Sequence, residues 1–385
     1  MLLGGTLLGS IANRLGFSPL IGQMVAGIVL GPMIFGLVGD SHEMETLSGI
    51  CILFMMFLMG LSIDFEKIMK DNLAGASIIS LAGGLATFMA AMSVALLLGL
   101  KLNESLLVGI SFISTSTAIG FMVLSQIGDK SSRVYKTIMA VGTTDDIIAM
   151  LALSLFLSYM TSGIDIQSVF QLFLLVLGFI VLVLKSGRTI SEKLINWSAK
   201  RPDAQFVILI SIIIMFSVAY LSDLVGIASV TGAFLAGTIL ARSHASYKLV
   251  TPKIEVLSEQ FFIPIFFVYI GTRIDMVSIL ASQAIDLYIV KIPVYLVLLI
   301  GLIMAVMASK YFATYYFTRL IGGYEESERK KMGISMTPMG EYTLVIGQLG
   351  LVMFDMIEIC SVLASVVLVT SVITPIMLRK AYQNS

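Results

Sequence analysis

The chain has 385 residues, of which 58% are hydrophobic and only 12% are charged, whereas an average soluble domain carries roughly 25% charged residues. This composition predicts an all-α polytopic membrane protein, with the lipid bilayer as its surroundings. Basic and acidic residues balance at 24 each, so the net charge is zero. No basic stripe supports nucleic-acid binding, and we expect no nucleic-acid partner.

Cysteine and histidine give little support for disulfide or metal chemistry. Cys51 and Cys360 lie in separate apolar segments, while His42 and His244 stand alone in loop-like stretches. We expect buried thiols and no His/Cys metal site. Met1 opens directly into apolar sequence without a basic region, so we expect no cleaved signal peptide.

A helix needs about 20 apolar residues to cross roughly 30 Å of hydrocarbon. Thirteen segments are candidates, of which the first is short and the ninth borderline: 1–15, 18–35, 46–63, 72–99, 105–127, 133–160, 166–187, 204–223, 227–241, 254–273, 287–320, 328–352 and 355–378. Pro293, near the start of the eleventh, predicts a kink or a non-helical lead-in.

Positive charge supports this count, because cytoplasmic loops collect lysine and arginine. With the N-terminus outside, the inner loops and the C-terminal tail hold twenty of the 24 basic residues. Only Lys101 and Arg273 lie outside, while Lys291 and Lys310 fall within the eleventh segment. We predict an outside N-terminus and a cytoplasmic C-terminus.

The two halves of the chain resemble each other. Residues 22–27 align with 232–237, 57–64 with 268–275 and, more weakly, 109–111 with 333–335. Because the order is kept, we predict two inverted six-helix repeats, 1–160 and 203–385, joined by a linker helix and cytoplasmic loop at 161–202. The alignment also places the start of the eighth helix opposite a position before Met1, so we expect the natural chain to begin earlier.

Segments five and twelve carry polar interruptions at corresponding places. The fifth contains Ser114-Thr115-Ser116-Thr117, and the twelfth contains Thr337-Pro338-Met339-Gly340-Glu341. Proline removes a backbone donor and glycine loosens the turn, so both helices are predicted to break at the membrane midplane. Broken helices expose backbone groups that can coordinate ions. The alternative is a straight helix with back-bonded hydroxyl groups.

Two adjacent acids, Asp145 and Asp146, interrupt the sixth segment, although Asp costs roughly 2.5–3.5 kcal/mol at the centre of a membrane helix. Helix neighbours point about 100° apart, so one carboxylate can meet a partner while the other faces a cavity. An unpaired buried lysine would lose its proton, so we assign Lys310 to Asp145. Asp146 is then the free ion carrier; the alternative is a structural bridge with Asp146 facing headgroups.

Other charged residues have less defined roles. Glu341 stabilises half-helix ends or serves as a relay, and we favour the structural role. Asp64 and Asp275 are predicted helix-end or gating residues, and Arg273 is predicted to anchor the outer face. The long side chain of Lys291 can extend and place its ammonium group at the membrane interface.

The pattern as a whole resembles the cation/proton antiporter superfamily, in the branch that joins NapA-type sodium/proton antiporters with Kef-type potassium efflux proteins. The likeness covers nearly the whole chain and is carried by Gly27 to Pro32, Phe57 to Asp64, Ser114 to Ala118, Thr144 to Ile147, Phe261 to Gly271, Lys310, and Gly340 to Tyr342. It implies an NhaA/NapA-like fold of crossed broken helices, a homodimer, and an elevator mechanism. It also implies a core domain from helices 4–6 and 11–13, and a prokaryotic plasma membrane.

The resemblance also implies roles for single residues. Asp146 matches the ion-binding acid and Asp145 its neighbour, so both are the candidate metal ligands for transported sodium. Thr115, Ser116 and Thr117 match the crossover stretch beside the site; hydroxyl, carboxylate and carbonyl oxygens suit a hard cation. No resident cofactor is implied. Some relatives carry an arginine where Met339 stands, so an Arg–Glu bridge to Glu341 cannot be carried over.

We therefore predict a secondary active sodium (or lithium)/proton antiporter that is electrogenic, serves pH homeostasis and is not an enzyme. A second proton would travel on Asp145 or Lys310, which titrate as a pair. A Kef-type potassium/proton antiporter and a sodium-coupled solute symporter are the alternatives. An intramembrane aspartyl protease is disfavoured, because its two acids must come from separate facing helices.

Overall fold

The structure, a computed structural model, describes the following residues: 1–39, 41–61, 73–116, 133–162, 174, 178–179, 181–199, 205–225, 229–241, 250–281, 284–287, 290–354 and 356–383. Within them the chain is helical apart from one two-stranded hairpin. Seven of the described helices are long and apolar enough to cross a membrane: His42–Leu61, Gly75–Leu97, Arg133–Leu157, Phe206–Leu224, Thr251–Thr272, Val294–Ile321 and Ile357–Gln383. The fold is therefore that of a multi-pass helical membrane protein.

One group of helices packs together and is called the first group below. It comprises α1 (Leu2–Arg14), α2 (Pro19–Leu30), α3 (His42–Leu61), α11 (Gln205–Leu224), α12 (Ser229–Ala241) and the continuous segment α14 (Thr251–Leu257), η2 (Ser258–Phe262) and α15 (Ile263–Thr272). Helix α2 packs on α1 and α15, and α3 packs on α12. The π-helical turn η2 lies just before Pro264, which has no N–H to donate to the helix.

Glycines allow the closest helix contacts in this first group. A Cβ atom at Gly27 would lie 2.1 Å from the Val268 carbonyl oxygen, and one at Gly237 would lie 2.2 Å from the Phe57 carbonyl oxygen. The first contact brings α2 against α15 beside Gly271, and the second brings α12 against α3. Residues aligned between the two halves thus make equivalent contacts, because only glycine permits such backbone approach.

A second group of helices surrounds the two predicted breaks. It comprises α5 (Leu73–Leu97), α6 (Leu102–Ser111), α8 (Arg133–Ser162), α17 (Val294–Ile321), α18 (Glu326–Ser335), α19 (Glu341–Phe354) and α20 (Ile357–Gln383). Helix α5 packs on α17 and α8, and α19 packs on α20. Gly322 and Gly323, with φ of +79° and +77°, turn the chain from α17 into α18, a conformation that glycine adopts readily.

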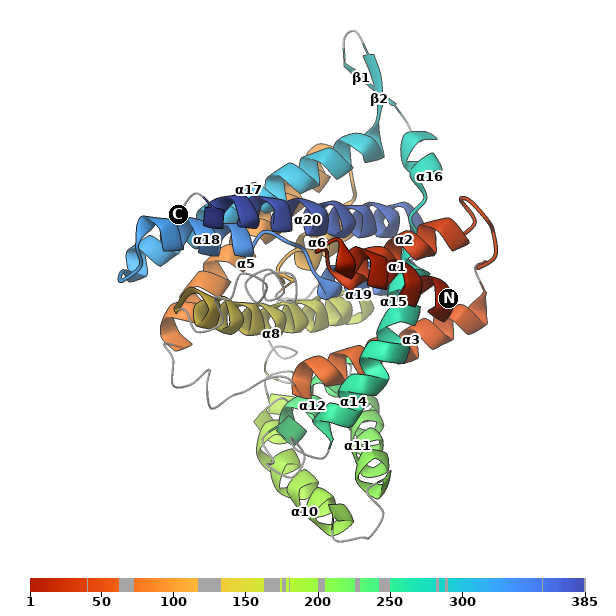
Figure 1. The fold of residues 1–385 in the computed structure, drawn as a ribbon, viewed down its shortest axis with the longest axis vertical. Helices are drawn as coiled ribbons and strands as arrows, with labels where there is room; N and C mark the ends of the chain where they lie inside the picture. Colours follow the sequence, from red (N-terminus) through yellow and green to blue (C-terminus); the bar gives the residue numbers. More distant parts are fainter. Residues whose placement is uncertain are drawn as a thin grey trace.

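The start of the eleventh segment differs from the expectation. Strands β1 (Ala284–Leu287) and β2 (Val290–Pro293) form an antiparallel hairpin with Asp286 opposite Lys291, and α16 (Met276–Ala281) precedes it. The hairpin projects beyond the helices in Figure 1. Helix α17 therefore begins at Val294, directly after Pro293, and not at residue 287. The expectation of an all-α chain needs this one correction.

A helix also replaces part of the loop expected before residue 203. The π-helical turn η1 (Val183–Gly187) leads into α10 (Arg188–Ala199). Ser191, Ile195 and Ser198 are buried on α10, a helical spacing of one face, and the helix packs on α11 and α12. Most of the predicted seventh segment lies outside the described residues.

Candidate functional site

The interruptions in segments five and twelve meet each other. Helix α6 ends at Ser111 and α18 ends at Ser335, while α19 begins only at Glu341. Thr115 and Met339 form an antiparallel bridge, and the Ser116 N–H donates to the Pro338 carbonyl at 2.9 Å. The break predicted in the twelfth segment is confirmed. The residues of segment five beyond Ser116, including the predicted site residue Thr117, lie outside the described residues.

Gly340 lets the two breaks lie in direct backbone contact. A Cβ atom at Gly340 would lie 2.9 Å from both the Cα and the N atom of Ser116. Backbone cannot move aside as a flexible side chain can, so a side chain at residue 340 would push the crossing apart. The glycine of the Met339-Gly340-Glu341 motif is thus needed for packing at the crossing.

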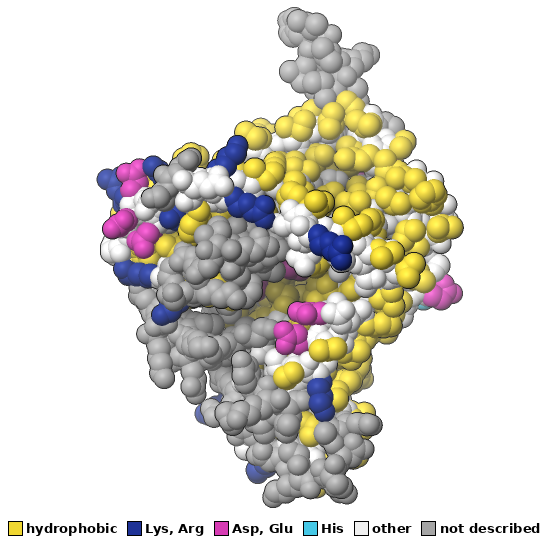
Figure 2. Space-filling view, in the orientation of Figure 1, with side chains coloured by type: hydrophobic (Ala, Val, Ile, Leu, Met, Phe, Trp, Pro, Cys, Tyr) yellow, Lys and Arg dark blue, Asp and Glu magenta, His cyan; other side chains and the backbone are white. Residues whose placement is uncertain are grey.

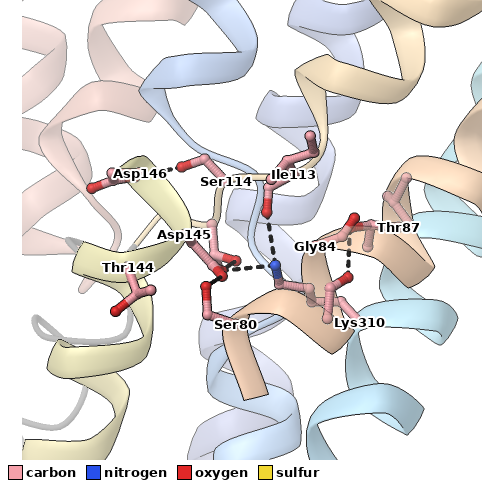
Figure 3. Close-up of polar contacts among 12 residues, drawn as sticks. Ser80, Gly84, Thr87, Ile113, Ser114, Thr144, Asp145, Asp146 and Lys310 are labelled. Carbon is pink, nitrogen blue, oxygen red and sulfur yellow. Dashed lines mark hydrogen bonds and ion pairs between the residues drawn. The ribbon is translucent and has the colours of Figure 1, made fainter. Parts of the chain in front are cut away.

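Asp145 is fully buried, and each of its oxygens has polar partners. Lys310 Nζ lies 2.7 Å from its Oδ2 atom, Thr115 Oγ1 donates to Oδ2 at 2.9 Å, and Ser80 Oγ donates to Oδ1 at 2.5 Å. Figure 3 shows Lys310 and Ser80 converging on Asp145 from two other helices. Such compensation is required, because removing one partner of a buried ion pair costs about 3–5 kcal/mol.

Lys310 reaches this position from the middle of α17. Its Nζ also donates to the Ile113 carbonyl at 2.8 Å, next to the break after α6. Gly83 on α5 leaves room for the lysine stem, since a Cβ atom there would already lie 3.4 Å from Lys310 Cδ and Cε. The lysine therefore joins α17 to the first break as well as to Asp145.

Asp146 points away from the ion pair, as Figure 3 shows. Ser114 Oγ donates to Asp146 Oδ1 at 2.5 Å, and 9% of the residue is exposed. Thr144 bonds back within its own helix, its Oγ1 donating to the Ala140 carbonyl at 2.8 Å. The adjacent acids thus have different surroundings: within the described part of the chain, Asp145 is held by a lysine and two hydroxyl groups, and Asp146 is held by the Ser114 hydroxyl.

Two further hydroxyl groups lie at the site with no hydrogen-bond partner in the described part of the chain. They are Ser116 Oγ, beside the crossing, and Tyr342 Oη, on the residue after Glu341. Both residues are buried, with exposed fractions of 1% and 2%. Buried polar groups usually have partners, so these oxygens are candidates to contact a transported ion.

Sequence reasoning missed Ser80, Ser114 and Tyr342 as members of the site. Ser114 stood inside the recognised hydroxyl run and could have been found there. Ser80 lies in a 25-residue apolar helix with no local signal. Only the packing of α5 against α8 brings it to Asp145.

The remaining predicted residues lie elsewhere. Glu341 begins α19 and borders a cavity described below. The Asp275 N–H donates to Ser361 Oγ at 2.8 Å, and Arg273 donates to the Tyr269 hydroxyl. Asp64 lies outside the described residues. Among those that are described, no group of three or more His, Cys, Asp or Glu side chains could hold a metal ion, and Cys51 and Cys360 are free buried thiols.

The sequence matches the family described as "Sodium/hydrogen exchanger, transmembrane" over residues 2–381. The chain belongs to this family. As an exchanger, it is similar to the Na(+)/H(+)-K(+) antiporter GerN of Bacillus cereus, with 26% identity over 99% of this chain and 94% of the relative. It is also 28% identical to a Na(+)/H(+) antiporter of Enterococcus hirae, over 100% of this chain and 98% of the relative.

The fold of the exchanger has a counterpart among solved structures. The sodium proton antiporter MjNhaP1 from Methanocaldococcus jannaschii superposes with a TM-score of 0.74, covering 99% of this chain and 94% of its own. The two sequences are 14% identical, so this likeness concerns the fold alone. Membership of the cation/proton antiporter superfamily, expected from the sequence, is confirmed.

Proposed function

We propose that this exchanger is a sodium (or lithium)/proton antiporter in which Asp146 carries either the cation or the proton. The observation that carries the proposal is the difference between two adjacent buried acids. Asp145 is neutralised by Lys310 at 2.7 Å, whereas Asp146 is bonded to the Ser114 hydroxyl and, among the described residues, pairs with no cation. A carboxylate without a fixed cation can bind a mobile one, and a proton competes for the same oxygens.

Exchange follows from this competition. On one side of the membrane a proton neutralises Asp146, and on the other side a sodium ion displaces it. Ser114, which bonds to the Asp146 carboxylate, and Ser116, whose hydroxyl has no partner in the described part of the chain, supply hard oxygens that suit a small alkali cation. A second proton leaves from the Asp145–Lys310 pair when that bridge opens, which makes exchange electrogenic; the pair titrates as a unit.

In the proposed elevator mechanism, the second group of helices slides against the first group and carries the ion site with it. Helices pack extensively within each group, as α5 does on α17 and α2 on α15, whereas α2 and α20 make only a small contact between the groups. The few side-chain links across the boundary, such as Arg379 Nη2 to the Gly16 carbonyl at 2.7 Å, can be exchanged. We assign the second group to the core domain of each protomer in a homodimer built from inverted repeats. In the plasma membrane, the N-terminus of each protomer lies outside and the C-terminus is cytoplasmic.

Proteoliposomes with an imposed pH gradient test the proposal. Proton flux is recorded on adding sodium, lithium or potassium, for wild type and for Asp146→Asn. We expect a sodium or lithium response that Asp146→Asn abolishes. A potassium-only response would support the alternative potassium/proton antiporter, which is the second candidate because the relative GerN is a Na(+)/H(+)-K(+) antiporter. No response in the wild type would contradict antiport and favour solute symport.

A further inference from the structure

A cavity of about 550 Å³ lies between the first group of helices and α19. Its walls come from α1, α2, η2 and α15, and Glu341 borders it from the second group. Figure 2 shows acidic side chains bordering a hollow near the middle of the face where α1, α15 and α19 lie. Asn13, Ser18 and Glu259 also line the cavity, so it reaches the turn between α1 and α2.

Gln23 lines this cavity and carries a buried side-chain oxygen without a partner among the described residues. The residue is 6% exposed, and the oxygen is its Oε1. Leaving such a group unsatisfied costs about 1–3 kcal/mol. Packing does not require the amide, because the aligned residue of the other half is Ala233, which is fully buried.

Glu341 provides the negative charge at the same wall. It forms no ion pair in the described part of the chain. A carboxylate and an amide oxygen are hard ligands of the kind that alkali cations prefer. Of the two carboxylates that line the cavity, Glu341 is the one that also borders the smaller space leading toward Ser116.

The passage beyond Glu341 is narrow. A second space of about 10 Å³ shares Leu20 and Glu341 with the large cavity and reaches Ser116 at the crossing. A space of roughly 10–15 Å³ holds about one water molecule. A cation that moves from the cavity to the crossing must therefore lose most of its water near Glu341.

We propose that Gln23 Oε1 and the Glu341 carboxylate form a staging site for a monovalent cation at the inner end of the cavity. There the cation exchanges water for protein oxygens before it passes Ser116 to Asp146. The inference rests on the proposed antiport function and adds to it a second cation site, which is reached first from the side of the turn at residues 15–18. That side is cytoplasmic in the proposed topology.

The test measures the sodium KM separately from each side of the membrane, in proteoliposomes of defined orientation. Gln23→Leu and Glu341→Gln are expected to raise the KM about tenfold, the factor that 1.4 kcal/mol of binding gives, on the cavity side only. Gln23→Glu adds a charge to the site and is expected to lower the KM on that side. The matched control is Thr6→Val, which also lines the cavity but whose hydroxyl donates to the Leu2 carbonyl within α1.

The outcomes separate this inference from the proposed function. A wild type without exchange would contradict the function itself. Normal wild-type exchange with an unchanged KM in the Gln23 and Glu341 variants would overturn the staging site alone. An equal rise of the KM on both sides would also overturn it, because a purely structural change has no sidedness.

Discussion

The two broken segments share one backbone plan but carry different chemistry. Helix α6 and helix α18 begin alike: the Lys101 N–H donates to Glu104 at 3.0 Å, and the Glu325 N–H donates to Glu328 at 2.9 Å. In the last turn of each helix, Gly109 lies against Phe88 of α5, and Gly333 lies against Tyr311 of α17.

The helix that packs beside each break supplies the difference. At the first break α8 brings Asp145 and Asp146 to Thr115 and Ser114. At the second, α20 brings Thr370, whose Oγ1 accepts from the Met339 N–H at 3.2 Å, and Thr374, 2.9 Å from Thr337 Oγ1. In these contacts the neighbouring helix therefore brings two carboxylates to the first break and neutral hydroxyl groups to the second. The shared plan holds the chain open, and the neighbouring helix decides which break meets the paired acids.

The largest expected effect comes from removing the lysine charge that balances Asp145 at the first break. Lys310→Ala leaves Asp145 buried without its cation and should lower the free energy of unfolding by about 3–5 kcal/mol. Electrogenicity and the pH dependence of exchange should change with it. Thermal unfolding in detergent and transport currents in proteoliposomes measure both.

A double variant controls for lost packing in that experiment. Asp145→Asn with Lys310→Met removes both charges and should recover much of the stability, because neutral replacement of a buried pair is often tolerated. A Lys310→Ala protein with normal stability, electrogenicity and pH dependence would contradict the role given to the pair.

A smaller effect should distinguish hydroxyl groups at the two breaks. Ser114→Ala removes a hydrogen bond to a charged group, worth about 1.5–3 kcal/mol, and should lower kcat/KM for sodium roughly tenfold or more. Thr370→Val removes a neutral bond at the second break and should cost about 0.5–1.5 kcal/mol of stability with the sodium KM unchanged. Equal transport defects in both variants would show that the second break also takes part in ion binding.

Glycine substitutions at matching positions of α6 and α18 should destabilise the protein equally. Gly109→Ala and Gly333→Ala each place a Cβ atom within 3.0 Å of an aromatic ring carbon, at 2.9 Å from Phe88 and 2.8 Å from Tyr311. Each should destabilise the protein by about 1–3 kcal/mol. Gly49→Ala, which meets nothing within 4 Å, is the control and should stabilise α3 by about 0.5–1 kcal/mol. A large difference between the first two variants would break the comparison of the halves.

Several features of the site could be predicted from the sequence, although most of the chain is apolar helix. A proline and a glycine in segment twelve predicted its break, and Pro293 predicted a non-helical lead-in to α17; both are present. Lys310, placed opposite Asp145 by charge balance alone, lies 2.7 Å from it. These predictions succeeded because burying an unpaired charge or an unsatisfied backbone group is costly wherever it occurs.

What the sequence determined by itself was the membrane, the breaks and the charges that had to be balanced. Only the tertiary structure decided that Ser80 and Ser114 hold the two acids, that Gln23 lines the cavity, and that residues 284–293 form a hairpin. Polarity and proline act locally and can be read along the chain. Which hydroxyl group meets which carboxylate depends on the rotation and crossing of helices, and packing between distant segments sets both.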